Sequence, residues 1–274
     1  MKNYLFPKFF NNMSIEQLCE LCLRLGIDGP TLMVRGGYWV DEKNIFEKLP
    51  QVTAAIRRSG AQVSYADTSY RMDMADKLDD VLSLMSHNGI ELFRVSYIAK
   101  KSHSARELHD ALRFSMEKAE KAARKHGIKA VVQIHGGMYP HNASTAYFAC
   151  KDLDPQYLGI KIDLGNNLCQ EGFENIEYQV DLLGEYVAAV GEKDAALIRK
   201  NENEEGSKGW ERAFVPAYKG IANYDLLFAS LKKNNISVPG VLMPFYHGDE
   251  MALLEKELER EVAYFKRCQE ENGL

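Results

Sequence analysis

The sequence predicts a single (β/α)8 barrel that spans residues 1–274, and three observations support this fold class. Short apolar segments alternate with amphipathic segments along the whole chain, which is typical of parallel strands joined by helices. Gly26, Gly60, Gly89 and Gly127 each follow a polar or basic segment end and precede the next apolar run, as glycine does at helix C-termini. The repeat occurs eight times, and eight such units close a barrel.

The predicted elements alternate strictly along the chain. Strands are expected at residues 4–10, 31–34, 62–66, 92–97, 130–134, 158–162, 187–190 and 241–245. Helices are expected at residues 14–25, 45–58, 74–86, 104–125, 144–151, 176–186, 224–233 and 250–270. Ser14 is a suitable N-cap for the first helix, with Gln17 as its capping-box partner. An open doubly wound sheet is the competing architecture, but residues 10–13 read FNNM where such sheets often carry a glycine-rich phosphate turn.

Composition narrows the classes of partner. The net charge of −5 argues against nucleic acid, because such binding needs a clustered basic surface. No apolar run approaches the roughly 20 residues of a membrane span, and Pro7 and Lys8 interrupt any signal-peptide core. A cytoplasmic protein is therefore expected. The five cysteines form no disulfide framework; Cys19 and Cys22 share one face of the first predicted helix, which favours core packing over a redox or metal role.

Polar residues at the predicted strand ends define the candidate site, because chemistry in such barrels lies where strands end and loops begin. These residues are Arg35, Asp67, Ser69, Arg94, Ser96, Gln133, His135, Asp163, Asn166, Glu192, Lys193, Asp194, Tyr246 and His247. The charged segment at residues 201–210 is either a lid over this end of the barrel or a solvent loop.

Four segments resemble the xylose isomerase-like TIM barrel family of sugar phosphate isomerases and epimerases, in the same order along the chain. They read SIEQLCELCLRLGIDG at 14–29, KIDLGNN at 161–167, LGEYVAAVGEKDA at 183–195 and VPAYKGIANYDLLFASLKKNNISVPGVL at 215–242. The resemblance implies an isomerase or epimerase that moves a proton next to the carbonyl of a small sugar, polyol or keto compound. It also implies a divalent metal held by a Glu, an Asp, a His and a Glu at the ends of strands 5, 6, 7 and 8.

Residue by residue, the sequence keeps little of that ligand set. Asp163 matches the strand-6 ligand, whereas the strand-5 position is Gln133, a neutral amide. The strand-7 position falls on Gly191 and the strand-8 position near Phe245, neither of which offers a ligand. The resemblance therefore implies a divalent-metal site that is rearranged or lost.

Two alternatives stay open at this site. Asp163, His135 and His247 could form a displaced two-histidine, one-carboxylate site for Mn or Zn, or the histidines could bind substrate hydroxyls with no metal present. Lys193 could bind a phosphate or hydroxyl or act as an acid/base, or it could form a plain salt bridge across the barrel rim.

The resulting hypothesis assigns roles to eight residues. His135, Asp163 and Lys193 are the expected catalytic residues. Arg35, Arg94, Gln133, Asn166 and His247 are the expected substrate-binding residues. The expected partner is a small-molecule carbohydrate, and the sequence leaves open whether the chain forms a homo-oligomer. The alternative function is a non-catalytic carbohydrate-binding or assembly barrel.

Overall fold

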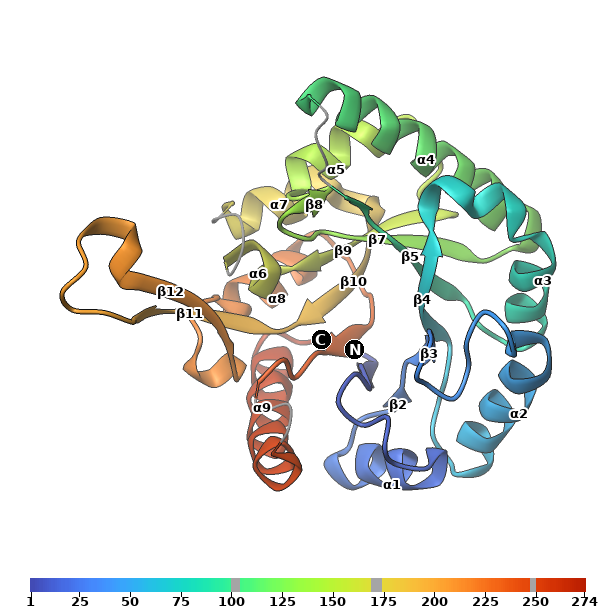
Figure 1. Ribbon diagram of the computed structural model, residues 1–274, viewed down its shortest axis with the longest axis horizontal. Helices are drawn as coiled ribbons and strands as arrows, with labels where there is room; N and C mark the ends of the chain where they lie inside the picture. The colour runs from blue at the N-terminus through green and yellow to red at the C-terminus, as the bar shows by residue number, and fades with distance from the viewer. Residues whose placement is uncertain (100–103, 169–173, 247–249) are drawn as a thin grey trace.

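The computed structural model describes residues 1–99, 104–168, 174–246 and 250–274. Its main sheet consists of parallel strands that curve into a barrel with helices around the outside (Figure 1). Neighbouring strands follow the order β2-β1-β13-β10-β9-β7-β5-β4-β3. The predicted (β/α)8 barrel is therefore confirmed.

The strands of the main sheet are short and buried. They are β1 (Asn3–Leu5), β2 (Gly29–Pro30), β3 (Leu32–Val34), β4 (Tyr65–Arg71), β5 (Leu92–Ser96), β7 (Lys129–Gln133), β9 (Leu158–Asp163), β10 (Val187–Glu192) and β13 (Gly240–Leu242). β2 and β3 are the two parts of one barrel strand, divided at Thr31, whose backbone N–H donates to Leu5 O at 2.9 Å. Because β2 pairs with β1 and β3 pairs with β4, this strand closes the barrel.

The helices cover the outer face of the barrel. They are α1 (Ile15–Leu25), α2 (Ile45–Arg58), α3 (Asp79–His87), α4 (Ala105–His126), α5 (Ala143–Cys150), α6 (Leu164–Asn166), α7 (Ile176–Leu183), α8 (Tyr224–Lys233) and α9 (Met251–Glu271). Among these described helices, none has the length and apolarity needed to cross a membrane. Cys19 and Cys22 are both buried in α1, consistent with the predicted packing role.

Local signals in the sequence match the structure. Ser14 and Gln17 form the predicted capping box at the start of α1. The four glycines that mark the repeat have φ angles of +68°, +84°, +70° and +65°, in the left-handed region that glycine adopts without strain. These turns reverse the chain from each helix toward the next strand.

Several predicted boundaries were wrong, and proline explains two of them. β1 ends at Leu5 and β13 ends at Leu242, where strands were expected to continue to residues 10 and 245. Pro7 and Pro244 lack the N–H that a strand ladder requires. The third helix is also divided, into a 3-10 helix η1 (Met72–Lys77) and α3.

The structure also contains two small antiparallel sheets that the sequence did not predict. β6 (Ile98–Ala99) pairs with β8 (Met138–Tyr139). β11 (Asp194–Arg199) pairs with β12 (Trp210–Val215), and this hairpin extends away from the barrel at the left of Figure 1. Most of the charged segment at 201–210 forms the tip of this hairpin.

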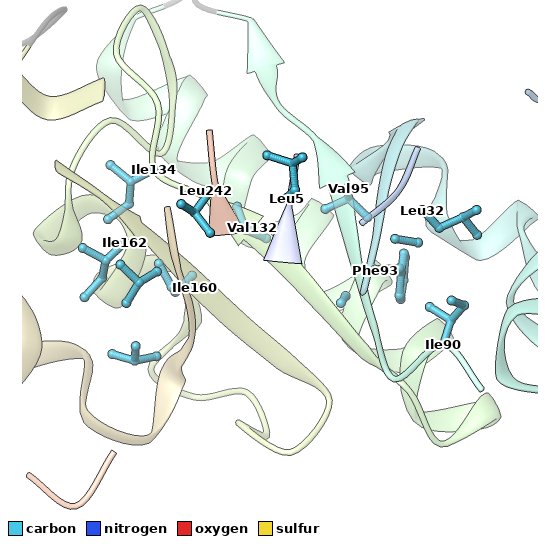
Figure 2. Packing of buried hydrophobic residues seen from close by; sticks show 14 of the residues in the cluster. Leu5, Leu32, Ile90, Phe93, Val95, Val132, Ile134, Ile160, Ile162 and Leu242 are labelled. Atoms are coloured by element: carbon cyan, nitrogen blue, oxygen red, sulfur yellow. The ribbon is translucent and has the colours of Figure 1, made fainter. Parts of the chain in front are cut away.

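Strand side chains alternate between two apolar clusters, as the pleat of a strand requires. The outer cluster packs against the helices and includes Leu5, Phe93, Val132, Ile160 and Leu242 (Figure 2). The inner cluster fills the barrel and includes Tyr4, Met33, Tyr65, Val131, Val241 and Met243. The same alternation directs Asp67, Arg94, Gln133, Lys161 and Asp163 inward, because each stands two residues from another inward-facing position.

Glu192, a candidate from the sequence, points away from the barrel interior. It accepts a hydrogen bond from Gln269 of α9 at 2.8 Å, and Gln269 also bonds Asn3 of β1. Burial and the nearby Glu261 raise the pKa of Glu192 to about 8. The carboxyl group therefore belongs to the contact between α9 and the sheet.

The raised pKa of Glu192 makes stability depend on pH. The folded chain holds a proton that the unfolded chain releases above about pH 4.5, so this group stabilises the fold at low pH. Its contribution is lost as pH rises toward 8. We expect Glu192→Gln to reduce the fall in unfolding free energy between pH 5 and 8 by up to about 1.4 kcal/mol per pH unit. Urea denaturation at several pH values measures this, with exposed Glu259→Gln as the control; equal slopes in all three proteins would contradict it.

Candidate active site

Asp163 ends β9 at the mouth of the barrel and is fully buried. Its side chain is also the N-cap of the short helix α6, because Oδ1 accepts the backbone N–H of Asn166 at 2.8 Å. The sequence Asp-Leu-Gly-Asn produces this turn by placing a carboxylate three residues before the amide that it binds. The carboxylate is thus held rigidly at the strand end.

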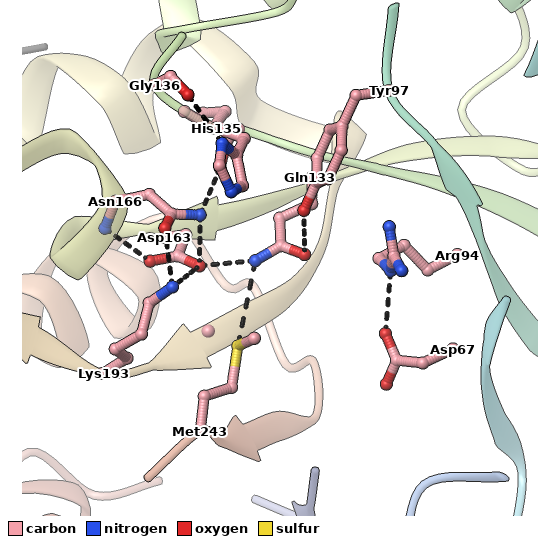
Figure 3. A network of polar contacts seen from close by, with 12 residues as sticks. Asp67, Arg94, Tyr97, Gln133, His135, Gly136, Asp163, Asn166, Lys193 and Met243 are labelled. Carbon is pink, nitrogen blue, oxygen red and sulfur yellow. Dashed lines mark hydrogen bonds and ion pairs between the residues drawn. The ribbon is translucent and has the colours of Figure 1, made fainter. Parts of the chain in front are cut away.

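Three side chains donate to the other oxygen of this carboxylate (Figure 3). Asp163 Oδ2 accepts hydrogen bonds from Gln133 Nε2 and from Asn166 Nδ2, the latter at 2.9 Å. Lys193 Nζ lies 3.2 Å from the same oxygen. Three predicted site residues therefore meet at Asp163.

Lys193 follows β10 and is 3% exposed. Its ammonium donates to Asn166 Oδ1 at 2.6 Å and lies 4.6 Å from the ring centroids of both Phe214 and Phe245. Its backbone is fixed by Tyr224, whose hydroxyl accepts the Lys193 N–H and donates to the Lys193 carbonyl. This is the pairing predicted for Lys193 with a rim carboxylate, but the partner is Asp163.

The neighbouring carboxylate, Asp194, does not pair with Lys193 in the described chain. Asp194 instead accepts the backbone N–H groups of Ala195 and Ala222 at 2.6–3.1 Å. Burial raises the pKa of Asp194 to about 7. This carboxyl holds the loops around the hairpin together.

Gln133 links Asp163 to two residues that the sequence did not single out. Gln133 Oε1 accepts from the Tyr97 hydroxyl at 2.9 Å, and Nε2 lies 3.8 Å from Met243 Sδ. Because Gln133 Nε2 also donates to Asp163, both ends of the amide are engaged. Tyr97 closed a predicted strand and was not recognised as a site residue, because its position alone carries no chemical signal.

His135 stands beside this cluster at the end of β7. Its Nδ1 donates to the Gly136 carbonyl at 2.7 Å, so a neutral ring carries its lone pair on Nε2. Burial is the main cause that lowers the His135 pKa below the usual 6.5. The nearby Lys193 lowers it further, whereas Asp163 opposes the shift. His135 is therefore neutral at pH 7.

Arg94 lies apart from this cluster (Figure 3). Its Nε donates to Asp67 Oδ1 at 2.9 Å, and its other nitrogens donate to the carbonyls of Thr68 and Val95. A guanidinium with these partners has little left to offer a ligand, so the predicted substrate contact of Arg94 stays a prediction.

Lys161 lies two residues before Asp163 and is completely buried. Within the described chain its Nζ has no hydrogen-bond partner, and it lies 5.4 Å from the Tyr65 ring centroid. Burial lowers the pKa of Lys161 to about 8, although Asp67 and Asp163 oppose this shift. Arg35 is exposed after β3, and His247 lies outside the described residues.

Comparison with solved structures supports the same architecture. The IOLI protein with a bound zinc atom has a TM-score of 0.76 at 11% identity, and the alignment covers 99% of both chains. The probable 3-DHS dehydratase AsbF from Bacillus anthracis has a TM-score of 0.71 at 13% identity, covering 97% of this chain and 99% of that one. D-psicose 3-epimerase has a TM-score of 0.70 at 13% identity, covering 98% and 99%.

The chain has the xylose isomerase-like TIM barrel fold. The structural neighbours include several epimerases and proteins described by that fold name. No protein-family model matches the sequence, and no curated protein matches it.

The four ligand positions of xylose isomerase-like barrels converge in this structure. Gly191 pairs with Asp163 across the sheet, and a Cβ at Gly191 would lie 3.0 Å from Asp163 Oδ2. On the eighth barrel strand, Met243 rather than Phe245 reaches Gln133. The four positions therefore carry the amide of Gln133, the carboxylate of Asp163, no side chain at Gly191 and the thioether of Met243.

These residues do not fit a divalent cation such as Mn²⁺, which favours carboxylate and imidazole ligands. Lys193 already places a positive charge 3.2 Å from the one carboxylate, and a second cation there would be repelled. Within the described parts of the chain, His, Cys, Asp and Glu form no group of three or more that could hold a metal. The displaced site with His135 and His247 stays a prediction, because His247 is not described.

We expect Mn²⁺, Mg²⁺ and Zn²⁺ to leave the thermal midpoint of the protein unchanged relative to EDTA. A ligand that binds only the folded state raises stability with its concentration, so the midpoint reports binding without an activity assay. Metal analysis of protein purified without nickel gives an independent readout. A metal-dependent rise that Asp163→Asn abolishes would overturn this expectation.

Proposed function

We propose that this barrel is a sugar isomerase or epimerase in which the Lys193 ammonium supplies the positive charge at the reacting oxygen. The observation that carries the proposal is the buried Asp163–Lys193 pair beside a neutral His135. The structural neighbours with sugar epimerase names support the choice of reaction class. The substrate would be a small sugar, polyol or related keto compound.

The chemistry divides between a base and an electrostatic group. His135 Nε2 takes the proton from the carbon next to the carbonyl, and the C–H electron pair moves to form an enolate. Lys193 faces the enolate oxygen and stabilises its negative charge, as fixed positive groups do in water-poor sites. For the isomer, the hydroxyl of the deprotonated carbon gives its proton to the enolate oxygen, and His135 returns the abstracted proton to the former carbonyl carbon. For the epimer, water delivers a proton to the opposite face of the deprotonated carbon, and His135 releases its proton to the resulting hydroxide.

The surrounding side chains keep the base and the charge in place. Asp163 and Asn166 position the ammonium, and Phe214 and Phe245 cover it against water. Hydrogen bonds to Tyr97 and Asp163 hold the Gln133 amide in a fixed orientation beside Asp163. Positioned groups of this kind supply a rate advantage because they need little reorganisation during the reaction.

A non-catalytic carbohydrate-binding barrel is the second candidate. The four contacts that Asp163 receives from the chain's own donors favour it, because they leave little of that carboxylate's acceptor capacity for a sugar hydroxyl. This candidate predicts sugar binding without turnover, and the same assays distinguish the two.

We expect the wild-type protein to isomerise or epimerise at least one ketose in the presence of EDTA. His135→Gln should lower kcat by about 10²–10⁴-fold, the range typical of a lost general base. Lys193→Met should lower it by about 10²-fold or more. NMR detection of solvent deuterium at the carbon next to the carbonyl measures the proton transfer directly.

The controls are exposed His87→Gln and Lys233→Met, which repeat the same chemical changes away from the site. The wild-type kcat/KM should fall as pH drops below about 6.5, because protonation removes the His135 lone pair. Undiminished exchange in His135→Gln would exclude this base. Sugar binding without exchange in the wild type would favour the non-catalytic barrel.

A further inference from the structure

Cationic side chains follow three of four successive barrel strands at the mouth. The strand order β10-β13-β1-β2, with β3 continuing β2, places the loops after these strands side by side. Lys193 follows β10, Phe245 follows β13, Lys8 follows β1 and Arg35 follows β3. We call Lys8, Arg35 and Lys193 the cationic arc.

Lys8 and Lys193 approach the same aromatic ring. Lys8 Nζ lies 4.2 Å from the Phe245 ring centroid, and Lys193 Nζ lies 4.6 Å from it. The two ammonium groups are therefore no more than about 9 Å apart. Lys8 is only partly exposed, so water screens this repulsion incompletely.

The pKa of Lys8 is lowered by burial first, and then by the charges of Lys193 and Arg35. Lys193 and Arg35 therefore both lie within electrostatic reach of Lys8. Such crowding of like charges is unfavourable unless an anion is present.

Lys8 and Arg35 differ from the other cations of the barrel mouth. Lys193 is paired with Asp163, and Arg94 with Asp67. Within the described chain, neither the Lys8 ammonium nor the Arg35 guanidinium makes a hydrogen bond or ion pair; Lys8 contacts only the rings of Phe9 and Phe245.

The acidic residues after Arg35 are engaged elsewhere. Asp41 accepts the backbone N–H groups of Lys43 and Asn44. Glu42 accepts the Ser69 hydroxyl at 2.8 Å. These contacts hold the loop after β3 together, and in the described chain neither carboxylate forms an ion pair with Arg35 or Lys8.

We propose that Lys8 and Arg35 bind an anionic group, a phosphate or a carboxylate, at the end of the substrate remote from the reacting carbonyl. This inference rests on the proposed function and narrows its substrate class to anionic sugars or polyols. The separation of at most about 9 Å between the Lys8 and Lys193 ammonium groups is within the length of a short carbon chain. The guanidinium of Arg35 provides paired donors, and Lys8 provides a point charge.

The experiment compares three ketohexoses that differ at C6. D-fructose is neutral there, D-fructose 6-phosphate carries a phosphate, and D-fructuronate carries a carboxylate. Dissociation constants are measured calorimetrically at low salt and at about 0.5 M salt, where charge interactions are screened. Binding is measured independently of turnover, so failure of this site and failure of the proposed reaction are distinguishable.

We expect at least one anionic sugar to bind the wild type tenfold or more tightly than D-fructose. Lys8→Met and Arg35→Gln should each lower the affinity for the anionic sugar far more than the affinity for D-fructose, and so remove most of that advantage. The exposed controls Lys233→Met and Arg58→Gln should retain it. The better of the two anionic sugars identifies the anion.

Three outcomes would overturn the proposal. These are equal affinity for the three sugars, no measurable binding of either anionic sugar, and an anionic preference that both Lys8→Met and Arg35→Gln retain. Tight anion binding without proton exchange would keep the anion site and remove the proposed reaction.

Discussion

The buried ion pair between Lys193 and Asp163 is the interaction on which the mouth of this barrel depends. Both charges are nearly or fully removed from solvent, and breaking such a pair by removing one partner costs about 3–5 kcal/mol. The chain therefore surrounds the pair with polar groups. Asn166 contacts both partners, and Gln133 and the α6 backbone complete the carboxylate.

Two glycines show how closely the backbone is fitted to this pair. A Cβ at Gly165 would lie 2.6 Å from the Lys193 carbonyl, and one at Gly191 would lie 3.0 Å from Asp163 Oδ2. A side chain at residue 191 would therefore press on the carboxylate, which would have to shift by a few tenths of an ångström. The glycine at residue 191 and the lysine pair therefore meet at one carboxylate, that of Asp163.

The fold could be predicted from the sequence because its signals are local. The glycines after the helices and the Ser14–Gln17 capping box act within one turn of the chain. The hairpin β11–β12 was missed because its pairing depends on a register between residues 194–199 and 210–215, and the intervening charges resemble an ordinary loop. The first and last strands were predicted to continue past Pro7 and Pro244 because the residues around these prolines are apolar. The missing N–H of each proline prevents the strand from continuing.

The candidate site was predictable only in part. Asp163, Asn166, Gln133, His135 and Lys193 stand at strand ends, which position along the chain reveals. The sequence does not show that Lys193 pairs with Asp163 and not with its chain neighbour Asp194, because this depends on how the strands are placed in the barrel. Met243, Tyr97 and Lys8 carry no motif, so only the convergence of different strands shows that they belong to the barrel mouth.

Charge balance connects the ion pair with the wider mouth. Of the described inward-facing groups discussed above, Arg94, Lys161 and Lys193 are positive and Asp67 and Asp163 are negative, all of them buried. Lys8 and Arg35 add positive charge above this layer. In a chain whose overall charge is −5, a positive mouth is a local feature that the net charge of the sequence does not reveal.

An anion bound in this partly buried site would stabilise the positions of the cations, because it relieves the repulsion among side chains already fixed in place. In the proposed reaction, the position of Lys193, set by Asp163, supplies the charge that stabilises the enolate, and together with Lys8 and Arg35 it underlies the proposed preference for anionic substrates.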